Sequence, residues 1–204
     1  MKDFKVLFIY PNLRGMNMLP PAIALFSRIL KDNGVEVVLF DTTYYKIGDD
    51  FDSDKEKEKN LAVRPFDISK KITLKTTDPF DDLDILVNSF QPNLIAMSAT
   101  EDIFPLGLRL LKHIDKYNIL TVMGGVFPTF APHKVILNKE IDIVCVGEGE
   151  RRKRDSSELF EIDWKYLSFI KCITAKNKII IISHSQNSFL LIFEPNAISQ
   201  SNTF

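Results

Sequence analysis

Short runs of apolar residues alternate along the chain with longer segments in which apolar residues recur every three or four positions. The short runs have the length of buried strands, and the longer segments have the spacing of amphipathic helices. Such an alternation of strand and helix is typical of an α/β protein with a parallel sheet. The predicted strands are residues 5–10, 35–40, 93–98, 119–123 and 141–146, and the predicted helices are residues 20–33, 81–90, 105–117 and 131–138.

The order of these elements predicts a doubly wound α/β fold, flavodoxin-like or Rossmann-like, with five parallel strands in the order 2-1-3-4-5. Its first β-α-β unit is clearly delimited, because Pro20-Pro21 opens the helix and Asn33-Gly34 ends it. A crossover between parallel strands is right-handed in nearly all proteins, which fixes the hand of this unit. We expect residues 1–150 to form the domain.

Two segments depart from the alternation. Residues 44–79 include a charge run of both signs, which indicates a long solvated excursion. The alternative is a flap over a ligand, because long loops in compact domains are often functional. Residues 151–204 begin with Arg-Arg-Lys-Arg and end rich in Ser, Asn and Gln, and only residues 156–170 have roughly helical spacing. This divergent tail is expected to be partly helical or disordered.

Composition narrows the class of protein. Hydrophobic residues make up 45% of the chain, enough for a core, and the formal charge of −1 argues against nucleic-acid and membrane-surface partners. Two cysteines, Cys145 and Cys172, are too few for a disulfide framework and indicate a reducing compartment. The first residues lack the apolar segment of a signal peptide, and the apolar run at residues 179–182 is too short to span a bilayer. We therefore expect a cytoplasmic protein.

Small or polar residues follow the last three predicted strands. Ser98 ends one strand, Gly124-Gly125 follows the next, and Gly-Glu-Gly-Glu follows the strand at residues 141–146. The carboxyl ends of parallel strands meet at one edge of the sheet, where ligands bind in open α/β folds. Glycines at such an edge allow a large planar ligand to approach the backbone. The sequence therefore predicts a ligand-binding edge built largely from backbone.

Residue chemistry favours a binding module over a self-contained catalyst. The first strand–helix loop, Tyr10 to Gly15, is not a Gly-x-Gly-x-x-Gly fingerprint. The three histidines have no metal-ligand spacing. Glu148 and Glu150, which flank Gly149, could form an acid/base pair, but no nucleophile or metal set accompanies them. Glu101 and Asp102 begin a predicted helix, where a carboxylate is usually a cap. We assign no catalytic residue and no metal ligand.

Residues 1–150 also carry five short motifs in a fixed order: Phe40-Asp-Thr-Thr-Tyr44, Val63-Arg-Pro-Phe-Asp67, Ser98-Ala-Thr-Glu-Asp102, Gly124-Gly-Val-Phe-Pro-Thr-Phe-Ala-Pro132 and Val144-Cys-Val-Gly-Glu-Gly-Glu150. Together they resemble the N-terminal cobalamin-binding domain of the B12-dependent radical SAM proteins. In that family cobalamin lies over the carboxyl edge of the sheet, and its nucleotide tail packs down between sheet and helices. The resemblance implies these cofactor contacts: Ser98, Thr100, Glu101, Gly124, Gly125, Pro128, Thr129, Gly147 and Glu148.

The chain departs from the family in two respects. The loop Asn12-Leu13-Arg14-Gly15 lacks the histidine with which methionine-synthase-type domains ligate cobalt, so bound cobalamin is expected to be base-off and without a histidine ligand. No Cys-x-x-x-Cys-x-x-Cys motif is present, so we expect neither an iron–sulfur cluster nor independent radical SAM activity. The resemblance ends at Arg151, which suggests a truncated or frame-shifted gene product.

Other functions remain open. The chain could supply cobalamin in trans to a partner radical SAM barrel, or it could be a remnant that binds nothing. A receiver-like or flavin-binding domain shares the predicted topology. Against a receiver, no acidic pair follows the first strand, and against flavin, the first loop lacks a Ser/Thr-rich phosphate-binding character.

Overall fold

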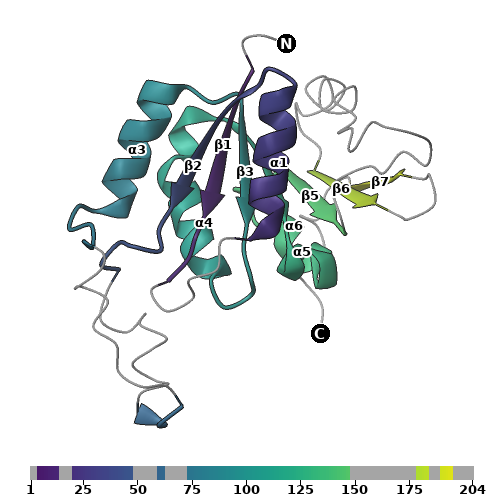
Figure 1. Ribbon diagram of the computed structural model, residues 1–204. Helices are drawn as coiled ribbons and strands as arrows, with labels where there is room; N and C mark the ends of the chain where they lie inside the picture. The colour runs from purple at the N-terminus through teal and green to yellow at the C-terminus, as the bar shows by residue number, and fades with distance from the viewer. Residues whose placement is uncertain are drawn as a thin grey trace.

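The computed structural model describes residues 4–13, 20–47, 59–62, 73–147, 178–183 and 189–194. Its strands form one sheet in the order β2-β1-β3-β4-β5-β6-β7 (Figure 1). The first five strands are all parallel and have the order 2-1-3-4-5, which confirms the predicted doubly wound, Rossmann-like fold. These five strands are β1 (Lys5–Tyr10), β2 (Glu36–Asp41), β3 (Leu94–Ser98), β4 (Leu120–Gly124) and β5 (Ile143–Val146).

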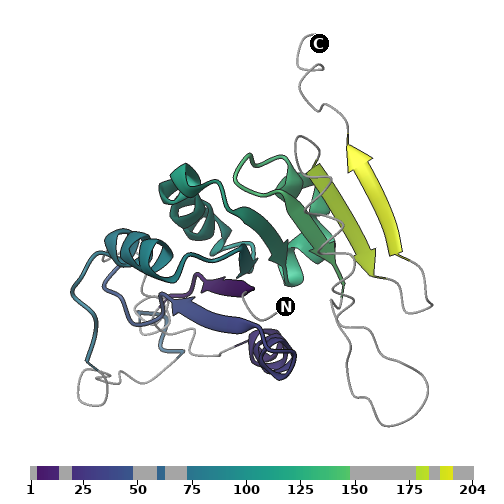
Figure 2. The same ribbon diagram turned by 90° about the horizontal axis from the view of Figure 1, so that it is seen from above.

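Helices cover the two faces of this sheet unequally. On one face, Ile23 and Leu30 of α1 (Pro21–Asp32) join Phe8 and Leu94 in a small apolar cluster. Figure 2 shows α1 on one side of the strands and α3 and α4 on the other. The helices of the second face are α3 (Pro79–Phe90), α4 (Phe104–His113), α5 (Val126–Phe130) and α6 (Pro132–Ile136).

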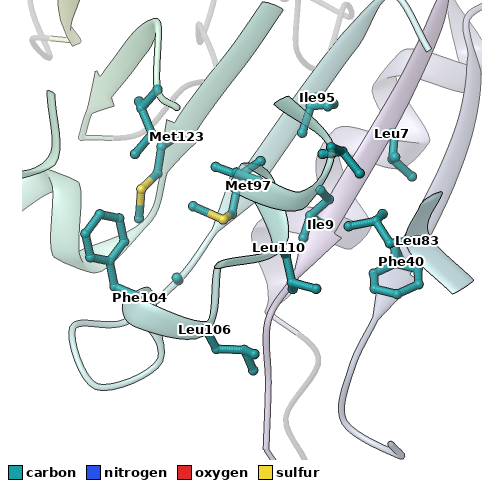
Figure 3. Packing of buried hydrophobic residues seen from close by; sticks show 14 of the residues in the cluster. Leu7, Ile9, Phe40, Leu83, Ile95, Met97, Phe104, Leu106, Leu110 and Met123 are labelled. Atoms are coloured by element: carbon teal, nitrogen blue, oxygen red, sulfur yellow. The ribbon is translucent and has the colours of Figure 1, made fainter. Parts of the chain in front are cut away.

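The larger core lies between the sheet and this second set of helices (Figure 3). Leu7 and Ile9 of β1, Met97 of β3 and Leu110 of α4 are each at most 2% exposed. Complete burial of such a side chain stabilises the fold by about 1.5–3 kcal/mol, so this face of the sheet carries most of the stability. The face under α1 is less completely buried, and it holds the candidate site.

Two helical segments differ from the prediction. The predicted helix over 105–117 is interrupted after His113 and continues as a separate 3₁₀ turn, η2 (Asp115–Tyr117), which Asn118 ends in a left-handed conformation. Residues 126–130, which lie between the predicted strand at 119–123 and the predicted helix at 131–138, form the one-turn helix α5. Pro132 then begins α6, since its fixed φ suits a first helical position. Within the described ranges, no helix is long and apolar enough to cross a membrane.

Two further strands extend the sheet beyond β5. β6 (Lys178–Ser183) pairs in parallel with β5, and β7 (Phe189–Glu194) pairs antiparallel with β6. No strand is predicted there from sequence, because a short apolar run alone does not distinguish a strand from a helix. The predicted helix over residues 156–170 lies outside the described residues, as does the basic cluster at residues 151–154.

A clasp of hydrogen bonds joins the two ends of the long excursion after β2. The backbone N–H of Lys75 donates to the carbonyl of Tyr44 at 2.8 Å. The Tyr45 hydroxyl donates to Asp82 Oδ2 at 2.7 Å and accepts from Lys75 Nζ at 3.0 Å. Both ends of the excursion are therefore fixed to α3. The predicted flap itself falls largely on residues 48–58 and 63–72, which lie outside the described residues.

The pKa shifts of Tyr45 and Asp82 keep both groups in the protonation states that their hydrogen bond requires. Burial, and then the hydrogen bond to Asp82, raise the pKa of Tyr45 well above its ordinary value. Hydrogen bonds from the hydroxyls of Thr77 and then Tyr45 lower the pKa of Asp82. Tyr45 consequently remains a neutral donor, and Asp82 remains a charged acceptor.

Replacement of Tyr45 by phenylalanine tests the clasp. We expect Tyr45→Phe to lower the free energy of unfolding by about 1–2 kcal/mol, because a hydrogen bond to a charged carboxylate is lost. Tyr44→Phe is the matched control, since the Tyr44 hydroxyl makes no hydrogen bond to any described residue, and it should cost less than about 0.5 kcal/mol. Urea denaturation measures both. Equal effects of the two substitutions would contradict this account.

Candidate functional site

Four residues form a row across the carboxyl ends of neighbouring strands. Ser98 of β3 is in register with Gly124 of β4, and a Cβ placed on Gly124 would have Cys145 of β5 as its nearest described neighbour, at 3.9 Å. On the other side, Ile9 of β1 pairs with Met97, so Tyr10 lies next to Ser98. The residues Tyr10, Ser98, Gly124 and Cys145 are called the strand-end row below.

The strand-end row lies on the face of the sheet that α1 covers. Ala96 and Val122, two residues before Ser98 and Gly124, pack against the apolar cluster of α1. Since side chains alternate along a strand, Ser98 and Gly124 point to the same face. All four residues of the row are half-buried. A ligand over Ser98, Gly124 and Cys145 would meet small residues without displacing the main core.

On the opposite face of the sheet, the side chains next to the strand-end row are almost completely buried. Met97, Met123 and Val144, each one residue before a member of the row, are 2%, 0% and 0% exposed. Each strand end therefore places a fully buried apolar side chain on one face and a small, half-buried residue on the other. Among the described residues, this contrast favours the α1 side as the side on which a ligand approaches.

Gly125 is required by the fold. Its backbone has φ +106° and ψ −164°, a conformation essentially restricted to glycine. A Cβ at this position would also lie 2.8 Å from Ser98 Oγ, closer than real Cβ contacts. Gly125 thus lets the chain turn sharply from β4 into α5 while it touches the end of β3.

Gly124 has no such requirement. Its φ lies outside the left-handed region, and the nearest described atom to a Cβ would be at an ordinary contact distance of 3.9 Å. Glycine at the end of a strand costs about 0.5–1 kcal/mol relative to alanine. A glycine that packing does not demand often marks a place where a ligand approaches the backbone. Gly124 is therefore the stronger ligand candidate of the pair.

Thr129 connects the segment after β4 with the segment after β5. Its hydroxyl donates to the carbonyl of Gly125 at 2.8 Å and accepts from the N–H of Gly147 at 3.1 Å. Beside it, Phe127 is buried and its ring packs against Phe104 of α4, with 5.0 Å between ring centroids. Three of the residues implied by the resemblance, Gly125, Thr129 and Gly147, are thus brought together by hydrogen bonds.

The other implied contacts do not belong to the strand-end row. Thr100 and Glu101 are exposed in the turn before α4, where the Thr100 hydroxyl donates to Asp102 Oδ1 at 2.5 Å. Pro128 is buried in α5. Glu148 lies outside the described residues.

Sequence reasoning missed two members of the row. Tyr10 is predicted only as part of a strand, and Cys145 is not among the implied cofactor contacts, yet Cys145 is half-buried beside Gly124. Burial and then the Asp41 carboxylate raise the pKa of Tyr10, so it is neutral at physiological pH. The register of adjacent strands is the signal that would have identified both residues. This register can be assigned only when the ends of the strands are known.

The first loop is held at its start by a buried polar cluster. Asn12 is 1% exposed; its N–H donates to Thr42 Oγ1 at 2.8 Å, and its Nδ2 donates to Thr43 Oγ1 at 2.8 Å. These bonds fix the end of β1 against the end of β2. The rest of that loop, from Arg14, lies outside the described residues. Within the described part of the chain, no group of three or more His, Cys, Asp or Glu side chains could hold a metal ion.

Comparison with known proteins adds little to this geometry. No protein-family model and no curated protein matches the chain. Among solved structures, a phosphomethylpyrimidine kinase from Clostridium difficile 630 aligns with 93% of this chain and 85% of its own length, at 13% sequence identity and a TM-score of 0.42. A likeness at this level carries no argument about function.

The two glycines should respond differently to alanine. We expect Gly125→Ala to lower the free energy of unfolding by about 1–3 kcal/mol, because of the left-handed backbone and the contact with Ser98. Gly124→Ala should be neutral or stabilise by up to about 1 kcal/mol. Urea denaturation of the two variants, with wild type as reference, checks the difference. Equal costs, or a larger cost at Gly124, would show that this assignment of roles is wrong.

Proposed function

We propose that this chain is a cobalamin-binding module that holds the cofactor at the carboxyl ends of β3, β4 and β5. The single observation that carries the proposal is Gly124, which lies between Ser98 and Cys145 and which packing among the described residues does not require. The order of motifs along residues 1–150, which resembles the family's cobalamin-binding domain, supports the same ligand.

The chemistry of the strand-end row suits the nucleotide tail of cobalamin. That tail ends in a flat heteroaromatic base, which needs a surface without protruding side chains. Ala96, Ser98 and Gly124 provide small residues on the α1 side of the sheet, and all three are half-buried. The Ser98 hydroxyl can donate to or accept from polar atoms of the tail. The role of this row is to bind and orient the cofactor.

We propose that cobalamin binds base-off and without a histidine ligand from the first loop. At the start of that loop stands Asn12, whose amide is buried and hydrogen-bonded to Thr43. His113 ends α4, which runs back from the carboxyl edge of β3 to the amino edge of β4, so it lies at the far end of the sheet. In the resembled family, cobalamin carries a methyl group or assists radical chemistry begun by S-adenosylmethionine.

The proposed module acts with a partner. The chain contains two cysteines, fewer than the three that bind the radical SAM cluster, so we propose that the cluster is held by a radical SAM barrel outside these residues and that the bound cobalamin serves this barrel. Anaerobic reconstitution with iron and sulfide should therefore leave no stoichiometric cluster on the purified chain. A stoichiometric cluster would contradict this part of the proposal.

Cofactor retention tests the proposed function. Purified protein is incubated with hydroxocobalamin, desalted and examined by ultraviolet–visible absorbance. We expect retained corrinoid with a base-off spectrum, and loss of most of it in Gly124→Val, because the added side chain occupies the place beside Ser98 and Cys145. Gly124→Ala, which adds one methyl group, should cause a smaller loss. Urea denaturation checks that both variants remain folded.

Each contrary outcome rejects a different part of the proposal. No retained corrinoid on folded, monodisperse wild-type protein would contradict cobalamin binding and leave the non-binding remnant as the better account. Equal retention by wild type and folded Gly124→Val would contradict the location. A base-on spectrum would contradict the expected ligation.

A further inference from the structure

Thr129 occupies the point where the β4–β5 pairing stops. The paired residues of these strands are Val122 with Ile143 and Met123 with Val144. Beyond these pairs the two strands diverge. β4 is followed by Gly125, and β5 is followed by Gly147, whose φ is +86°. The hydrogen bond from the Gly147 N–H to Thr129 Oγ1, at 3.1 Å, joins the two segments where the backbone ladder no longer does.

The Thr129 hydroxyl makes two hydrogen bonds, and only one of them is usual for a threonine in a helix. A threonine in a helix often donates to the carbonyl four residues earlier, as Thr129 does to Gly125 at 2.8 Å. This local preference does not explain the hydrogen bond with Gly147, which is 18 residues away in sequence. A hydroxyl has one donor and two acceptor sites, so the donor of Thr129 is used and one acceptor site is filled.

The rest of α5 makes Thr129 a rigid support. Phe127 and Pro128 are buried, and the Phe127 ring packs against Phe104 of α4. The backbone N–H of Thr129 donates to Gly125 at 3.3 Å, and that of Ala131 donates to Phe127 at 2.9 Å. The hydroxyl is therefore fixed to the core, whereas Gly147 is exposed. The bond holds Gly147, and not α5, in place.

We propose that Thr129 is a positioning residue: it fixes Gly147, the first residue after β5, relative to Gly124 and Gly125 so that both strand ends contact the same ligand. The ligand part of this inference rests on the proposed cobalamin site. The hydroxyl is directed to Gly125 and Gly147, so Thr129 acts on the ligand through these two residues.

A pair of substitutions separates positioning from packing. Thr129→Val keeps the shape of the side chain but removes both hydrogen bonds, and Thr129→Ser keeps the hydroxyl. In ligand-free protein, we expect amide exchange of Gly147, followed by NMR, to be about tenfold faster in Thr129→Val than in wild type, as for the loss of one ordinary hydrogen bond. The dissociation constant for hydroxocobalamin should rise by about tenfold. Thr129→Ser should restore both values.

The two readouts distinguish the inference from the function on which it rests. Faster exchange of Gly147 in Thr129→Val, together with weaker binding that serine rescues, supports the positioning role. Unchanged exchange in a folded Thr129→Val protein overturns it, whatever the affinity. Faster exchange with unchanged affinity overturns the link to the ligand. If wild type binds no hydroxocobalamin, the proposed function fails, and the exchange measurement still decides whether Thr129 holds Gly147.

Discussion

The left-handed backbone of Gly125 is the constraint on which the arrangement of the strand ends depends. With φ +106° and no Cβ, Gly125 lies against Ser98, and α5 begins directly at the end of β4. This start places Phe127 against Phe104 and brings Thr129 within reach of Gly147. Any other residue at this position would strain the backbone and place a Cβ 2.8 Å from Ser98 Oγ, which would weaken the contacts that follow.

The two faces of the same strand ends differ in burial, which separates the core from the proposed binding site. Met97, Met123 and Val144 are almost completely buried under the helices of the second face. Their immediate neighbours Ser98 and Gly124 lie half-buried on the α1 side. The alternation of side chains along a strand makes this separation possible, because a ligand can meet one face while the other keeps its core. Small residues on the α1 side therefore cost the fold little.

The sequence predicts the framework better than the site. Apolar runs locate the first five strands to within about two residues, and the alternation with helices predicts their order. The Gly124-Gly125 pair is also visible, but only backbone conformation and neighbouring atoms separate a glycine that the turn needs from one that packing does not demand. The role of Thr129 depends on a partner 18 residues away, and that of Cys145 depends on strand register, so neither follows from local pattern. β6 and β7 are not predicted because their apolar runs do not alternate with segments of clear helical spacing, as the first five runs do.

The most direct test of the account is to map the ligand on the protein. Isotope-labelled chain is titrated with cyanocobalamin, in which cobalt(III) is diamagnetic, and backbone amide shifts are followed by NMR. The account predicts the largest changes at Ser98, Gly124, Gly125 and Cys145, with little change on the opposite face near Leu110. Saturable binding with its largest shifts elsewhere, or no shifts at all in folded protein, would contradict a cobalamin site at these strand ends.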